Sequence, residues 1–217
     1  ANNELFADGQ RLPLARWPNE GYTTFGEIVE PASEEGQTPE FRYLESRPDR
    51  WNTDEDIWLY GYWRRGYRAE FIRVKKIDVQ TKTIQLAARN SLGELDDGGA
   101  SRYFAVNLLD ELDALGEWFL DRRTHTLYLI APQGIESHDV TLSINPEAVV
   151  CCRGVQHVEF RGLGIECSAC DGIRIEEGSD CRLVGCEIRN VAFNGISASG
   201  DRHAIVGCDI RNTGNAG

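Results

Sequence analysis

The sequence is short of positive charge and has no long apolar run. It carries 23 Lys and Arg against 35 Asp and Glu, so its formal net charge is −12 at pH 7. This excess of acid argues against a nucleic-acid backbone and against an anionic membrane surface as partners. No stretch approaches the roughly 18 apolar residues that a membrane span needs. The first residues, Ala1 to Glu4, lack the basic start and apolar stretch of a signal peptide, so a signal is either missing or lies upstream.

Several residue types are missing from one part of the chain. All five Trp precede residue 119, the last Lys is Lys82 and the last Pro is Pro146. In contrast, all seven Cys follow residue 150. Hydrophobic residues make up 41% of the sequence, which is enough for a core and excludes wholesale disorder. The change in composition predicts two architectures, residues 1–146 and residues 147–217.

Residues 147–217 contain an internal repeat. Glycines and isoleucines recur 23 and 22 residues apart, at Gly162, Gly185 and Gly207 and at Ile165, Ile188 and Ile210. This period fits a leucine-rich repeat or a parallel β-helix. Leu is sparse and helical periodicity is absent, so short strands broken by Gly, Asn and Asp favour β-helix coils of about three strands each. The residues expected to point inward are Phe160, Leu163, Ile165, Ile173, Leu183, Cys186, Ile188, Ile196, Ile205, Cys208 and Ile210.

The repeat ends within a coil, at Gly217. One coil cannot bury its own inner face, so neighbouring coils stabilise one another. An open β-helix end exposes unpaired backbone groups. We therefore expect residues 147–217 to be the first coils of a β-helix that is open at its C-terminal end. The chain is then either a piece of a longer protein or self-associates through that open end.

Residues 1–146 are predicted to form an antiparallel β-sandwich or barrel-like domain. Asp8–Gly9 is a strong hairpin signal. Further strands are expected at Asp56–Trp63, Glu70–Ile77, Lys82–Leu86, Gly116–Leu120 and Thr126–Ile130. The stretch from Asn107 to Ala114 suggests one short helix. The polar segment from Glu30 to Asp54, with three prolines, is expected to be a long surface loop.

These residues carry a family resemblance. Leu5–Gly9 followed by Ala15–Asn19, and Gly116–Arg122 followed by Thr126–Tyr128, resemble a pattern in right-handed parallel β-helix proteins that act on carbohydrate. The run Gly162–Gly217 looks like their coils. Among them are glycoside hydrolases of the fucosidase/xylanase-like and β-xylosidase-like kinds, with a β-sandwich-like insert. The resemblance implies a polysaccharide partner and a secreted or periplasmic location. The resemblance also implies that the catalytic carboxylates commonly lie in later coils than those present here. No catalytic residue can therefore be carried over to this chain.

Two acidic residues are the catalytic candidates from the repeat itself. Glu187 and Asp209 occupy equivalent places on adjacent coils, as do Arg189 and Arg211. Strand alternation puts all four outward, with neighbours about 5 Å apart. The acids could flank a glycosidic bond, while the arginines bind substrate. The alternative is a solvated ladder in which each acid is balanced by an Arg.

Further substrate-binding candidates come from turns and aromatic residues. Asp171 and Asn194 precede equivalent glycines, where such residues usually serve the backbone, although a role at a groove edge stays open. Trp51, in the polar segment, is the aromatic residue expected to be exposed. The other aromatics could stack on sugar or pack in a core, and they are Trp17, Trp58, Tyr60, Tyr62, Trp63 and Tyr67. The Arg64–Arg65 pair could meet an acidic sugar.

No cofactor or metal is expected. Cys167 and Cys170 have CxxC spacing, but no second pair follows and no His stands at ligand spacing. The cysteines are predicted to be buried free thiols, which leaves the redox compartment open. The leading hypothesis is a glycoside hydrolase. The alternatives are a non-catalytic glycan-binding or structural module, and a polysaccharide lyase, which the absence of Lys after Lys82 makes less favoured.

Overall fold

The structure is a computed structural model that describes residues 3–52, 56–64, 66, 68–91, 93–96 and 101–214. Arg65, Tyr67 and Gly217 lie outside these residues. The described helices are three short 3₁₀ turns, η1 (Arg47–Arg50), η2 (Leu109–Glu111) and η3 (Ile135–Ser137). None of the helices in this part of the chain could cross a bilayer.

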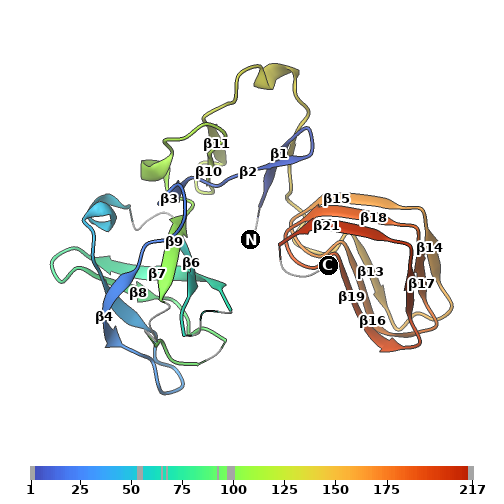
Figure 1. The fold of residues 1–217 in the computed structure, drawn as a ribbon, viewed down its shortest axis with the longest axis horizontal. Coiled ribbons are helices and arrows are strands. Elements are labelled where there is room, and N and C mark those ends of the chain that lie inside the picture. Colours follow the sequence, from blue (N-terminus) through green and yellow to red (C-terminus); the bar gives the residue numbers. More distant parts are fainter. Residues whose placement is uncertain are drawn as a thin grey trace. The chain divides into compact units, whose positions relative to one another are not determined.

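The chain forms two compact units (Figure 1). The coil unit comprises the residues up to Leu12 and those from Gln133 onward, and the sheet unit is Pro13–Pro132. The sequence predicted a single boundary after residue 146 instead. The difference arises because β1 (Leu5–Ala7) pairs with both β2 (Gln10–Leu12) and β12 (Val140–Leu142), which follows it by more than 130 residues. Local patterns do not reveal such distant pairing.

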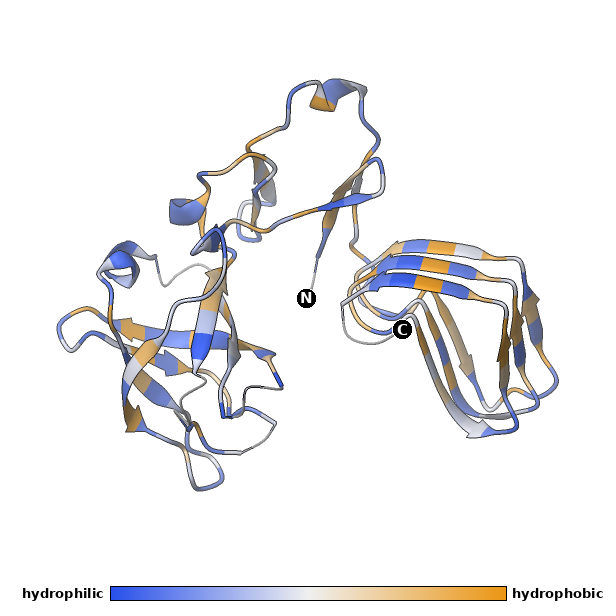
Figure 2. Ribbon diagram, in the orientation of Figure 1, coloured by the Kyte–Doolittle hydropathy of each residue, from blue (hydrophilic) through white to orange (hydrophobic). Residues whose placement is uncertain are grey.

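Three parallel sheets build the coils. In order, they are β13 (Val150–Arg153), β16 (Ile173–Ser179) and β19 (Ile196–Asp201); β14 (Glu159–Arg161), β17 (Arg182–Val184) and β20 (Ala204–Val206); β15 (Gly164–Ser168), β18 (Glu187–Val191) and β21 (Asp209–Thr213). We name the first coil β13–β15, the middle coil β16–β18 and the last coil β19–β21. Ile165, Ile188 and Ile210 pair in register, and Figure 2 shows this apolar column across the strands. The predicted all-β class is confirmed, and the sheets of this part of the chain are parallel.

Left-handed bends explain the polar part of the repeat. Gly162, Gly185 and Gly207 have φ of +65°, +61° and +62°, a conformation that glycine adopts without a Cβ clash. Asn190 and Asn212 both have φ of +54°, which Asn tolerates better than most residues. Their side chains stack, with Asn212 Nδ2 donating to Asn190 Oδ1 at 3.3 Å. The period therefore marks bends that every coil repeats.

Burial depends on the coil in which a residue lies. In the middle coil, Ile173 and Ile188 are both 0% exposed. By contrast, Leu163 of the first coil is 37% exposed and Ile205 of the last coil is 51% exposed, so their predicted burial was wrong. The middle coil has a coil on each side, whereas each outer coil has only one among the described residues. Stacking rather than strand alternation alone decides burial here.

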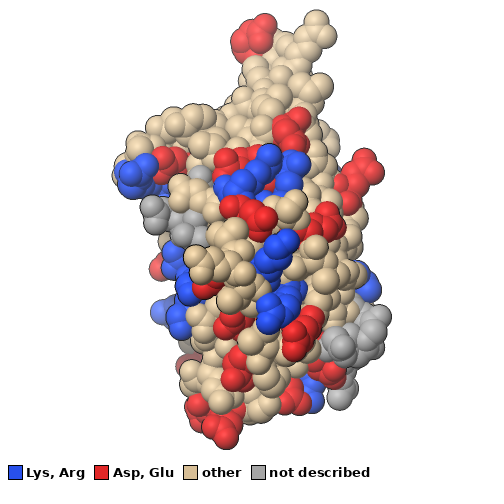
Figure 3. All heavy atoms as spheres, turned by 90° about the vertical axis from the view of Figure 1, so that its left-hand side faces the viewer, with Lys and Arg blue, Asp and Glu red and all other residues tan. Residues whose placement is uncertain are grey.

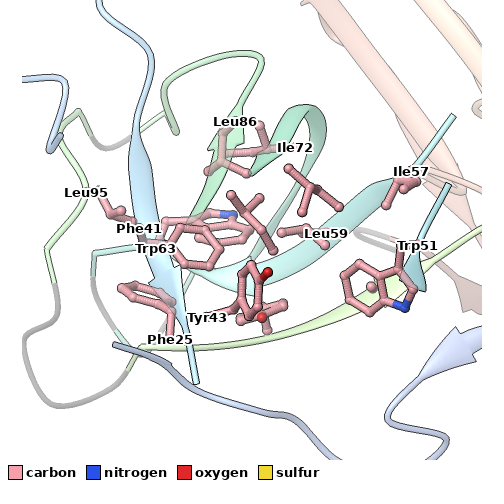
Figure 4. Packing of buried hydrophobic residues seen from close by; sticks show 14 of the residues in the cluster. Phe25, Phe41, Tyr43, Trp51, Ile57, Leu59, Trp63, Ile72, Leu86 and Leu95 are labelled. Carbon is pink, nitrogen blue, oxygen red and sulfur yellow. The ribbon is translucent and has the colours of Figure 1, made fainter. Parts of the chain in front are cut away.

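The sheet unit is a seven-stranded, mainly antiparallel sheet. Its strand order is β3 (Arg16–Trp17), β9 (Arg102–Val106), β6 (Trp58–Tyr62), β7 (Glu70–Asp78), β8 (Thr83–Leu86), β5 (Glu40–Tyr43) and β4 (Phe25–Glu30). β7 pairs with β6 through its first half and with β8 through its second half, and the register shifts between Val74 and Lys76. Residues from both halves of the sheet supply the core, including Phe41 of β5, Leu59 of β6 and Trp63, which directly follows β6 (Figure 4). Among the described strands, β3 and β4 do not pair, so the sheet does not close into a barrel.

Local details both confirm and correct the expected elements. The hairpin of β10 (Trp118–Asp121) and β11 (Thr126–Leu129) is present as predicted. The loop predicted over residues 30–54 was wrong in its middle, because it contains β5 and η1. Phe41 and Tyr43 of β5 are buried, so this polar segment contributes a central part of the core. The short helix expected near Asn107 is only the three-residue η2.

Truncation of the middle-coil column should destabilise the coil unit. Ile188→Ala removes a fully buried side chain, so we expect a loss of about 2–5 kcal/mol in the free energy of unfolding. Ile205→Ala, at an exposed place in the last coil, should cost under about 1 kcal/mol. Urea denaturation followed by far-ultraviolet circular dichroism measures both. Equal losses would contradict the central role of the middle coil.

Candidate active site on the outer coil face

The predicted acids and arginines lie on one face of the coils. β18 and β21 turn Ile188 and Ile210 inward, so the residues on either side of each point outward. Glu187 pairs in register with Asp209, and Arg189 with Arg211. Glu166 of β15 pairs with Arg189 in the same sheet. We call Glu166, Glu187, Arg189, Asp209 and Arg211 the coil face.

The coil face is a continuous ladder of ion pairs. Arg189 donates from Nε to Glu166 Oε2 at 2.7 Å and from Nη1 to Glu187 Oε1 at 3.2 Å. Arg211 donates to Glu187 Oε1 and to Asp209, so one guanidinium bridges both predicted catalytic acids. The hydrogen bond to Glu166 and the charges of Glu166 and Glu187 raise the pKa of Arg189. An acid bound in this way can act as an ionised nucleophile, but it has to leave its arginine before it can donate a proton.

Asp171 joins two bends and is buried. Its Oδ2 accepts from Arg174 Nε at 2.9 Å and Nη2 at 2.6 Å. Its Oδ1 accepts from the backbone N of Asn194 at 3.0 Å and from the side-chain Nδ2 at 3.1 Å. With both oxygens engaged inside the protein, Asp171 and Asn194 hold the turns together, as the sequence pattern favours. The structure does not bring them onto the coil face.

Trp51 is buried, so the prediction that it is exposed was wrong. The side chain is 5% exposed, and its Nε1 donates to Glu111 Oε1 at 2.6 Å. Glu111 is itself fully buried and accepts hydrogen bonds from Arg47 and Arg50. The ring of Trp51 meets that of Trp17 edge-on at 5.8 Å. Trp51 therefore offers no ring face to a ligand. Its hydrogen-bond partner Glu111 lies 60 residues away in the sequence, so the local pattern did not reveal the burial.

Sequence reasoning missed a polar hollow beside the coils. Gln10, Arg11, Asn190 and Asn212 line an open space of about 260 Å³ within the coil unit. The β1–β2 hairpin is fixed there because Asn190 Nδ2 donates to Gly9 O at 2.6 Å. Arg11 Nη2 donates to Val191 O at 3.2 Å and lies 2.9 Å from Glu4 Oε2. The recurring Asn is visible in the sequence, but the docking of the β1–β2 hairpin onto it leaves no local sequence signal.

The cysteines form no metal site in the part of the chain that the structure describes. All seven are free thiols, with Cys181 and Cys186 buried and Cys151 exposed, so burial holds for only part of the set. Across residues 3–214, apart from the gaps, no three His, Cys, Asp or Glu side chains gather as metal ligands would. Cys170 instead accepts a hydrogen bond from Arg174 Nη2 at 3.3 Å.

Comparison with known proteins finds a likeness of fold. No protein-family model and no curated protein matches the sequence. One solved structure, described as "Glycoside hydrolase", matches with a TM-score of 0.65 and 11% sequence identity. The match covers 97% of this chain and 54% of that one, so the chain spans about half the length of this neighbour. At this identity the likeness concerns the fold alone.

Substitutions should distinguish the structural role of the buried Asp171 from that of the exposed Glu187 by their effects on stability. Asp171→Ala leaves Arg174 and Asn194 without their shared partner, so we expect a loss of about 3 kcal/mol in the free energy of unfolding. Glu187→Ala removes an exposed member of the ladder and should cost under about 1 kcal/mol. Chemical denaturation measures both variants. A small loss for Asp171→Ala would contradict its structural role.

Proposed function

We propose that the protein acts on polysaccharides as a glycoside hydrolase and that Glu187 and Asp209 form its carboxylate pair. The observation that carries this proposal is their in-register place on adjacent parallel strands of an outward face. Strands in a sheet are about 4.8 Å apart, close to the ~5–5.5 Å that separates the carboxyl groups of retaining glycosidases. The fold shared with a glycoside hydrolase supports the same substrate class.

The ladder assigns different roles to the two acids. Glu187 accepts from both Arg189 and Arg211, and a carboxylate positioned by two guanidinium groups suits the role of nucleophile. Among the described side chains, Arg211 alone donates to the carboxylate of Asp209. A substrate hydroxyl or carboxylate that draws Arg211 away would free Asp209 to exchange a proton with the leaving oxygen. Arg189 and Arg211 then act as substrate-binding residues.

A second candidate is a non-catalytic glycan-binding module. The specific observation in its favour is that every acid of the coil face already accepts a hydrogen bond from an arginine. Such a face binds polar ligands through its exposed guanidinium groups without any reaction. The polar hollow lined by Gln10 and Arg11 would extend a surface of this kind. We further propose that the protein works outside the cytoplasm, where polysaccharides occur.

The hydrolase proposal predicts that Glu187→Gln and Asp209→Asn each lower turnover by about 10²–10⁴-fold, the usual contribution of a general acid or base. A panel of plant and algal polysaccharides, assayed for released reducing sugar, identifies the substrate. Arg202→Gln is the control, because Arg202 pairs with Asp180 at 2.7 Å on another part of the coils.

The outcomes separate the candidates. Glycan binding without reducing sugar from any substrate supports the binding module. An unsaturated product that absorbs in the ultraviolet indicates a lyase instead. Full activity in both acid variants would refute the assigned pair.

A further inference from the structure

Aromatic residues also gather on the outer side of the sheet unit. Along β6, Leu59 and Gly61 are buried, whereas Tyr60 and Tyr62 alternate with them and point outward. Outward residues of the neighbouring strands are Phe71 of β7 and Arg102 and Phe104 of β9, and Tyr22 lies beside them. We call Tyr22, Tyr60, Tyr62, Phe71, Arg102 and Phe104 the aromatic face.

The rings form one connected surface. Tyr60 pairs across the sheet with Phe71 on one side and Phe104 on the other, with ring centroids 4.6 and 5.1 Å apart. Tyr22 bridges Phe104 at 5.4 Å and Tyr62 at 5.9 Å. Phe71 is 51% exposed and Tyr22 is 40% exposed. The outer side of an antiparallel sheet is usually polar, so contiguous exposed rings mark a binding surface.

Arg102 gives this surface a positive charge. Its guanidinium lies 4.1 Å from the Tyr62 ring centre and 5.4 Å from that of Tyr22. No acid among the described residues pairs with it. Arg73, on the same side of the sheet, pairs instead with Asp56 at 2.7 Å. Basic side chains in Figure 3 mostly lie beside acidic ones, as a net charge of −12 leads one to expect.

A second arginine at this face is already engaged. Arg16 lies 3.8 Å from the centre of the Phe104 ring. Its Nε donates to Pro18 O at 2.8 Å and its Nη2 to Gly21 O at 2.7 Å, so backbone carbonyls satisfy it. Arg102 is therefore the guanidinium that can meet an anion of a ligand. A guanidinium held over aromatic rings is also well placed for a two-point contact with a carboxylate.

The chemistry of the face selects among anions. Exposed rings with one guanidinium could also suit single-stranded nucleic acid, but that ligand needs a basic groove, which a chain with 35 acids against 23 bases is unsuited to supply. Pyranose rings have apolar C–H faces that stack on aromatics. Burial raises the pKa of Tyr22 and Tyr60, so their hydroxyls stay protonated and can bond to sugar hydroxyls.

We propose that the aromatic face binds an acidic polysaccharide, with the rings stacked on its sugars and Arg102 paired with a uronate carboxylate. The choice of a polysaccharide rests on the proposed function, whereas the acidic character rests on Arg102 alone. All six residues of the aromatic face belong to the sheet unit, whereas those of the coil face belong to the coil unit.

The test compares short oligogalacturonates with the same oligomers after methyl esterification, which removes their charge and adds a methyl group to each uronate. Calorimetric titration of the full chain should show the acid form binding about tenfold tighter than the ester. Arg102→Gln should abolish this preference and Arg102→Lys should restore part of it. Phe71→Ala should weaken both forms roughly fivefold, because it removes a stacking ring.

Arg73→Gln is the matched control, since it removes an arginine of the same side of the sheet whose charge Asp56 already balances. It should keep the full preference, and thermal melting checks that each variant is folded. Absence of binding, equal binding of acid and ester, or a preference that survives Arg102→Gln would overturn the proposal. The calorimetric test needs no turnover, so binding without hydrolysis refutes the proposed reaction but leaves this surface standing.

Discussion

The in-register stacking of coils is the constraint on which the coil unit depends. Each coil bonds to the next through three sheets at once, so a shift in one strand would have to occur in all. Ile188 lies between Ile165 and Ile210, which are 23 and 22 residues away in sequence, and a register shift between β16 and β19 after Ile175 absorbs the difference of one residue. Since alternate residues must point the other way, the column also dictates which side chains form the outer face.

The same register creates an electrostatic problem that the arginines solve. Placing Glu187 directly beside Asp209 sets two like charges on neighbouring strands, which destabilises a sheet. Arg211 removes the repulsion by bonding both acids, and Arg189 does the same between Glu166 and Glu187. The ladder thus balances the charges that the stacking brings together. Catalysis would have to use acids that are already paired with arginines, which is why a substrate that competes for Arg211 is needed to activate the pair.

The sequence predicted what repeats or is local and failed where the partner is distant. Gly162 and its equivalents revealed the coils because left-handed bends need glycine in each turn. The Asp8–Gly9 hairpin was likewise found locally, but its pairing with β12 was not. Trp51 looked exposed because its neighbours in sequence are polar, whereas Glu111, 60 residues on, buries it through a hydrogen bond. The alignment of Glu187 with Asp209 was predictable, but the bridging by Arg211 needed coordinates.

Departure from the alternating pattern is the most informative feature of the sheet unit. An antiparallel sheet with one solvated side should alternate apolar and polar residues. On β6 the inward Leu59 obeys the rule, but the outward Tyr60 and Tyr62 break it. The core does not need them, because buried rings such as that of Phe41 already fill it. Outward rings on two further strands, the exposed Phe71 and the half-buried Phe104, repeat the exception. It therefore belongs to a surface that stability alone does not explain, and a ligand that covers those rings accounts for them.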